Sequence, residues 1–181
     1  MKLRKENKLV LRVVDIQTVS IAVASASVTV AAIYYVWQIR HQTRIRQTDL
    51  VNRLYSTFIS TDFMDETMRF ASLEFKDYKD YVNKYGPIVS VGESGPKYNN
   101  TPELKSILLV DNFFNQVGIL LHRGLIDAGL VSDVFGYRVE MLWNKAEPLI
   151  QGFRKELNQP EAGKWFEYLY NELQKGKQGG A

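Results

Sequence analysis

The chain has 181 residues, no cysteine and a formal charge of +3, with a sequence pI near 9.0. The absence of cysteine excludes disulfide frameworks, cysteine-ligated metal sites and thiol nucleophiles. Twelve glycines and five prolines are too few for a fibrous chain, and a charged fraction of 24% is too low for a disordered one.

The first expected element is a transmembrane helix at residues 17–39, after a basic N-terminal segment at 1–16. Residues 16–39 carry no charged side chain, and as a helix this run is roughly 36 Å long, enough to cross a hydrocarbon core of about 30 Å. A cleaved signal peptide and a buried core helix are the alternatives, and the length of the run favours an uncleaved anchor. Aromatic rings and cations typical of a membrane interface lie at its end and just beyond: Tyr34, Tyr35, Trp37, Arg40, Arg44 and Arg46.

Small residues occupy two opposite faces of this expected helix. Close approach of helix backbones in lipid requires small side chains, so these faces predict association with other membrane helices, in an oligomer or a larger complex. The alternative is that they reflect only a compositional bias. One face consists of Ala22, Ser25, Ala26 and Thr29, and the other of Ser20, Ala24, Ser27 and Ala31.

The positive charge is confined to the flanks of the expected span. Residues 1–60 hold nine Lys and Arg against three Asp and Glu, whereas residues 61–181 hold fourteen against seventeen. Anionic lipid head groups are therefore the expected partner of the cations, and nucleic acid is not, because the folded domain is acidic. The cations on the two sides of the span are nearly balanced and leave its orientation open, with the cytoplasmic side preferred for the C-terminal domain.

Helical periodicity continues without Gly or Pro after the span, which predicts a juxtamembrane stalk helix at 40–60 joined directly to it. A helical domain at 61–175 and a flexible tail at 176–181 follow. Its expected helices begin after Ser60, near Asp77, at Thr101, near Asp127 and at Pro160. Residues 86–100 are expected to form a loop.

The helix that begins at Thr101 is expected to be the central core helix, because its apolar residues cover a wide arc. It should stop at Gly124. Pro148 should kink or divide the next helix. The last helix should end at Gly176. The predicted fold class is all-α: a single N-terminal transmembrane helix that continues into a stalk helix, followed by a small helical bundle.

Six segments after the expected span form a recognisable combination: Gln42–Thr48, Leu50–Tyr55, Asp80–Gly86, Gly118–Asp127, Val134–Gly136 and Trp165–Tyr170. Together they resemble an uncharacterised family of short, N-terminally membrane-anchored helical proteins of archaea and bacteria. The resemblance covers about residues 40–175 and implies an N-terminal span and a helical domain, with no known reaction.

One polar stripe within the helical domain is a candidate site. Asp111, Asn115 and His122, together with Gly118, share one face of the central helix. They could form an acid/base or metal pocket, although Asp111 and His122 lie roughly 16 Å apart along the axis and would need a third element to share a metal. The alternative is a solvated or hydrogen-bonded face, which we prefer.

These patterns favour a non-enzymatic, single-pass protein of the cell membrane that presents a helical interaction domain. Its expected partners are the lipid bilayer and other proteins or further copies of itself, and no cofactor or metal is expected. The alternative is a membrane-tethered enzyme or a domain that binds a small ligand or metal through the Asp111, Asn115 and His122 face.

Overall fold

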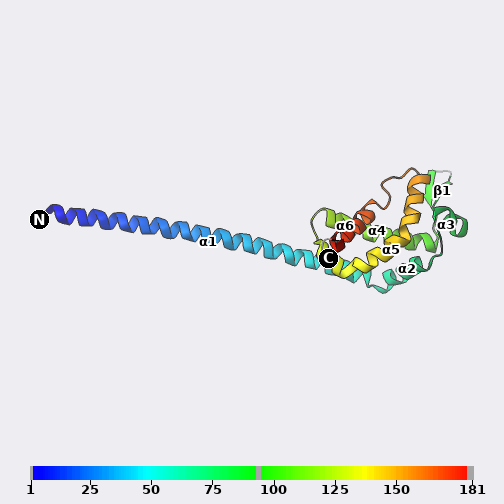
Figure 1. Ribbon diagram of the computed structural model, residues 1–181, viewed down its shortest axis with the longest axis horizontal. Helices are drawn as coiled ribbons and strands as arrows, with labels where there is room; N and C mark the ends of the chain where they lie inside the picture. Colours follow the sequence, from blue (N-terminus) through cyan, green and yellow to red (C-terminus); the bar gives the residue numbers. More distant parts are fainter. Residues whose placement is uncertain (1, 93–94, 179–181) are drawn as a thin grey trace. The chain divides into compact units, whose positions relative to one another are not determined.

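A computed structural model describes the backbone of residues 2–92 and 95–178, and the side chains of 16–90 and 97–177. The described residues form six helices and one two-stranded sheet, so the all-α fold class is confirmed. The first helix, α1, spans Lys2–Phe58 as one continuous element, as expected from the lack of Gly and Pro (Figure 1).

The chain divides into two compact units, residues 1–46 and 47–181, and α1 contributes to both. The boundary lies inside the predicted stalk at 40–60. Val51, Leu54 and Phe58 lie on one face of α1 at spacings of three and four residues, and all three are buried in the core of the second unit. The end of the predicted stalk is therefore a core helix of the bundle.

The short helices α2 (Thr61–Ser72) and α3 (Tyr78–Tyr85) follow the expected capping signals. The Ser60 side chain caps α2, and the Asp77 carboxylate accepts a hydrogen bond from the Asp80 amide at 2.9 Å at the start of α3. Gly86 ends α3 with a φ of 89°, a conformation that glycine adopts without strain.

The expectation of a loop at 86–100 was wrong for its central part. Strands β1 (Val89–Gly92) and β2 (Gly95–Tyr98) pair antiparallel, with Val89 opposite Tyr98. Two observations explain why this Gly- and Pro-rich segment forms a hairpin: Ile88 is buried before β1, and Asn99 after β2 donates its backbone N–H to the Ile88 carbonyl at 3.0 Å. The side chain of Asn99 also bonds to the Pro87 carbonyl.

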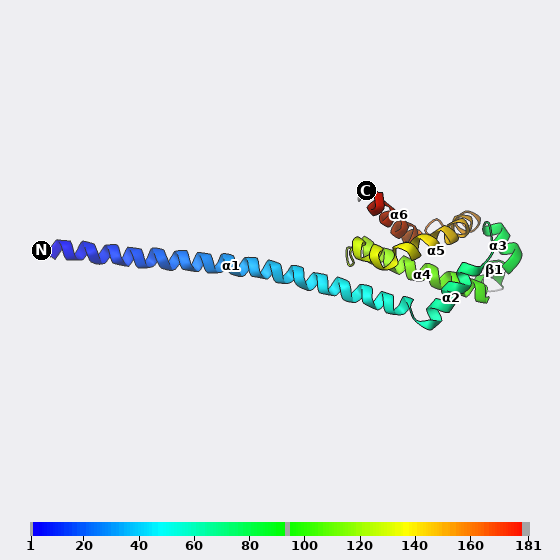
Figure 2. The same cartoon turned by 60° about the horizontal axis from the view of Figure 1, so that its bottom comes forward.

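The long helix α4 (Pro102–His122) is the central core helix, as predicted, and packs against α2, α5 and α6 (Figure 2). Helix α5 (Ala128–Glu156) runs through Pro148 as a single helix. Helix α6 spans Lys164–Gln178: it begins four residues after Pro160 and continues past Gly176. Residues 176–178 of the predicted tail are thus helical, and 179–181 lie outside the described residues.

Candidate functional site

The polar stripe of α4 faces α6, and its amide residue holds the start of that helix. Asn115 Oδ1 accepts hydrogen bonds from the backbone N–H groups of Trp165 at 3.0 Å and Phe166 at 3.1 Å. Its Nδ2 donates to the Asp111 carbonyl at 2.9 Å. The first N–H groups of a helix lack partners within that helix, so Asn115 caps α6 from a neighbouring element.

Gly118 lies one helical turn further along the same face, where α4 and α6 approach most closely. A Cβ atom at this position would lie 2.0 Å from the Trp165 carbonyl oxygen. Only glycine therefore permits this approach, and the contact accounts for the small residue in the stripe.

His122 belongs to a different environment from Asp111. It lies exposed at the end of α4, with its ring 4.7 Å from the Trp165 ring and 5.2 Å from the Tyr168 ring. Among the described residues no group of three or more His, Asp or Glu side chains could hold a metal ion. The stripe thus separates into an aromatic contact at His122, a helix cap at Asn115 and a carboxylate at Asp111.

Asp111 lines a partly open cavity of about 370 Å³ between α4, α5, β2 and the segment before α6. Most of its lining is apolar. The sequence offered no signal for this cavity, because its walls come from elements far apart in the chain. The lining residues are Phe70, Ile88, Tyr98, Leu104, Ile107, Leu108, Val110, Asp111, Asn112, Ala146, Leu149, Ile150, Phe153, Gln159, Glu161, Ala162 and Gly163.

Asp111 is half-buried, and one of its carboxylate oxygens lacks a matching donor. Its Oδ1 is shielded from solvent and has no hydrogen-bond partner within the described part of the chain. Burial raises the pKa of Asp111 from its usual 3.8 to about 6, an effect that the Asn115 amide and the Arg154 charge partly oppose. A carboxylate held in this way at an apolar cavity is typical of a functional residue.

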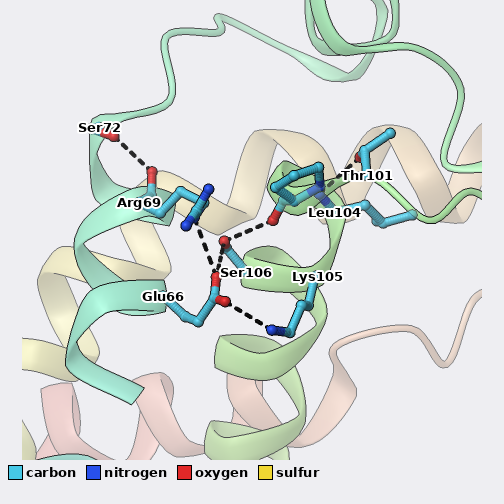
Figure 3. A network of polar contacts seen from close by, with 8 residues as sticks. Glu66, Arg69, Ser72, Thr101, Leu104, Lys105 and Ser106 are labelled. Carbon is cyan, nitrogen blue, oxygen red and sulfur yellow. Dashed lines mark hydrogen bonds and ion pairs between the residues drawn. The ribbon is translucent and has the colours of Figure 1, made fainter. Parts of the chain in front are cut away.

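A second polar cluster joins α2 to α4 (Figure 3). The buried Ser106 hydroxyl lies 2.6 Å from Glu66 Oε2, and Lys105 Nζ donates to Glu66 Oε1 at 3.0 Å. These bonds, that of Ser106 first, lower the pKa of Glu66 below its usual value. Every member of this cluster has a partner in the neighbouring helix or in its own, so its role is to connect the two helices.

The residues predicted to lie in the membrane are exposed along α1. The hydroxyls of the small faces bond within the helix, each to the carbonyl four residues earlier: Ser20, Ser25, Ser27 and Thr29, at 2.8, 2.8, 2.8 and 2.9 Å. At the aromatic end, the rings of Trp37 and His41 stack with centroids 5.6 Å apart. Ala22, Ala24, Ala26, Ala31, Tyr34, Tyr35, Arg40, Arg44 and Arg46 lie on the same helix.

A family model described as a domain of unknown function, DUF4760, matches residues 21–173, more than half of the chain. The chain belongs to the DUF4760 family. The match begins inside the uncharged run of α1 and extends into α6, so the DUF4760 domain includes part of this run as well as the bundle, the cavity and Asp111. Comparisons with curated proteins and with solved structures give no match.

The cap on α6 can be tested within this DUF4760 domain. Asn115→Ala removes the acceptor of two backbone N–H groups, and we expect it to lower the free energy of unfolding by about 1–2 kcal/mol, as cap removal does elsewhere. Thermal denaturation followed by circular dichroism measures this change. Asn115→Ser, which retains an acceptor on a shorter side chain, should lose less, and equal losses for the two variants would contradict the role of the cap.

Proposed function

We propose that the chain is a non-enzymatic, single-pass membrane protein, anchored by residues 17–39, that presents its helical domain for interaction. The main support is the uncharged run in α1, whose large apolar side chains are exposed. The exposed fraction is 70% for Val28 and 68% for Ile21. Exposed apolar surface costs roughly 25 cal/mol per Å² in water, and this cost disappears in a bilayer. The length and composition of the apolar part of α1 suffice for a membrane crossing.

The residues after the run support this placement. Amphipathic rings and cations are favourable at the head-group level, and α1 presents Trp37 stacked on His41, with Arg40 and Arg44 on adjacent turns. The hydroxyls of Ser25 and Thr29 already bond within the helix, so they carry little cost in lipid. Helix α4 also has the length and composition of a span, but it is the core helix of the bundle.

Expression of the full chain in a bacterial host tests the anchor. The chain should stay with membranes after alkaline carbonate extraction and should keep its full mass by mass spectrometry. A shorter mature chain lacking the apolar run would show a cleaved signal sequence and contradict the proposal.

The side of the membrane on which the domain lies can be tested separately. Because the chain lacks cysteine, the variant Tyr137→Cys, at an exposed position, carries a single thiol. Its reaction with a membrane-impermeant thiol reagent reports the side on which the domain lies. We expect the cytoplasmic side.

Association within the membrane should depend on the small faces. Since their hydroxyls bond within α1, the contact between helices depends on close backbone approach, which a larger side chain prevents. Ala26→Ile and Ala24→Ile should therefore each reduce the chemically crosslinked oligomer in membranes several-fold. Val23→Ile, which adds the same side chain between the two faces, is the matched control. Unchanged crosslinking in both alanine variants would contradict association through these faces.

The cavity at Asp111 supports a second candidate function, the binding of a small molecule by the helical domain. It has the volume and the largely apolar wall of ligand sites in other proteins, which hold roughly 300–1,000 Å³. Binding of this kind requires no catalysis and is compatible with a membrane anchor.

A further inference from the structure

We propose that the cavity of the helical domain binds a small amphipathic amine, with its apolar body against the walls and its ammonium group at Asp111. This inference rests on the second candidate function, small-molecule binding by the helical domain, and specifies the chemical class of the ligand. Charge complementarity supports it, since the cavity combines apolar walls with a carboxylate that forms no ion pair within the described part of the chain.

The charges around the cavity show why a cation fits. Among the described residues that line it, Asp111 and Glu161 carry carboxylates, and none is a lysine or arginine. Glu161 is exposed and lies 2.6 Å from Lys164 Nζ, so its charge is already balanced. Asp111 has no such ion pair within the described part of the chain, so the ionised carboxylate lacks a direct counterion in the cavity.

The cation that acts on Asp111 is bound to other groups. Arg154 of α5 exerts a Coulombic effect on Asp111, but its guanidinium lies 2.8 Å from Glu167 of α6 and donates to the Ala162 carbonyl at 2.8 Å. Its side chain is only 16% exposed, and the surrounding residues restrict it to this arrangement. Arg154 therefore compensates the Asp111 charge only from a distance, and a direct ion pair with Asp111 requires a cation from outside the protein.

The walls select for an apolar body. Leu104, Leu149 and Phe153 belong to the lining, which comes from α4 and α5 as well as from the hairpin and the segment before α6. Without a ligand, water is the available donor to Oδ1 of the carboxylate. An ammonium group that displaces this water adds a charge-assisted hydrogen bond, and the attached hydrocarbon removes apolar surface from water. A fatty acid of the same shape would instead place two carboxylates together.

Three probes with one apolar body test the proposal: 4-phenylbutylamine, 4-phenylbutanol and 4-phenylbutyrate. Each is titrated into the full chain in phosphatidylcholine nanodiscs and followed by isothermal titration calorimetry. The wild-type chain should bind the amine at least tenfold more tightly than the alcohol and the alcohol more tightly than the acid. Asp111→Asn should remove the preference for the amine. Because wild type and variant share the same lipid, partition of the probes into lipid cancels in the comparison.

Two further measurements keep the outcome decisive. Asn112→Trp, at an exposed position on the cavity rim, should weaken the binding of all three probes without a change in melting temperature, which assigns binding to the cavity.

Acidification through about pH 6 should weaken binding of the amine to the wild-type chain and leave its binding to Asp111→Asn unchanged. Equal binding of amine and alcohol by the wild-type chain would overturn the ligand class while leaving small-molecule binding intact. No binding of any probe at millimolar concentration would overturn both, and neither result bears on the membrane anchor.

Discussion

Asp111→Asn will raise the melting temperature of the chain at neutral pH. The pKa of Asp111 rises from 3.8 to about 6 on folding, chiefly because the carboxylate is buried. Each pKa unit corresponds to about 1.4 kcal/mol, so ionisation of Asp111 costs the native state on the order of 3 kcal/mol. Asparagine has nearly the same shape and carries no charge. We expect a gain of about 2 kcal/mol, since its amide still lacks a full set of partners.

The pH dependence identifies the cause of this gain. Below pH 3.8 the carboxyl group is protonated in both states and costs little. Between pH 3.8 and about 6 the unfolded chain ionises while the native chain keeps its proton, so the wild-type chain loses stability over this window and the loss is constant above it. The difference in melting temperature between variant and wild type should therefore grow from about pH 4 to 6 and then level off. A difference that is independent of pH would show that packing, and not ionisation, causes the gain.

This cost bears on function. A half-buried position without a role would be filled by a neutral residue of similar volume, because removal of a poorly solvated charge stabilises a fold. Local features that reduce stability concentrate at functional sites, where activity requires them. A more stable Asp111→Asn variant that no longer prefers the amine over the alcohol would show that Asp111 lowers stability and provides ligand selectivity.

The sequence predicts those parts of the fold whose causes are local. The caps at Ser60, Asp77 and Thr101 depend on side chains within three residues of the N–H groups they bond, and all three helices begin where expected. The start of α6 does not follow this rule. Its cap comes from Asn115, 50 residues earlier in the chain. The prediction from Pro160 therefore placed the start of α6 four residues too early.

The candidate site could be predicted only in part. Helical spacing placed Asp111 and Asn115 on one face, and the structure keeps them there, with a hydrogen bond from the Asn115 side chain to the Asp111 backbone. Spacing gives no information about what covers a face. Helix α5, the segment before α6 and Tyr98 of the hairpin form the cavity with α4 around Asp111, whereas His122 contacts the aromatic rings of α6. These contacts arise from packing between distant segments, which a periodic pattern in one helix does not encode.

Gly118→Ala will destabilise the bundle more than a single added methyl group suggests. The new Cβ would lie 2.0 Å from the Trp165 carbonyl oxygen and 2.7 Å from its carbonyl carbon, both backbone atoms that cannot rotate away. Helix α6 must therefore shift, which also disturbs the bonds from Trp165 and Phe166 to Asn115. Overpacking of this kind costs about 1–3 kcal/mol, and partial loss of the cap adds about 1 kcal/mol. We expect a net loss of about 3 kcal/mol in thermal or urea unfolding.

Gly176→Ala separates this steric effect from the general effect of alanine in a helix. Both glycines lie within helices, but a Cβ at Gly176 would have no atom within 4 Å. Alanine is favoured over glycine in helices by up to about 1 kcal/mol, so this variant should be neutral or slightly more stable. The same preference acts at Gly118, and the contact with Trp165 must outweigh it for the loss to appear. If the two variants changed stability equally, close approach of α4 and α6 would not be what requires glycine at this position.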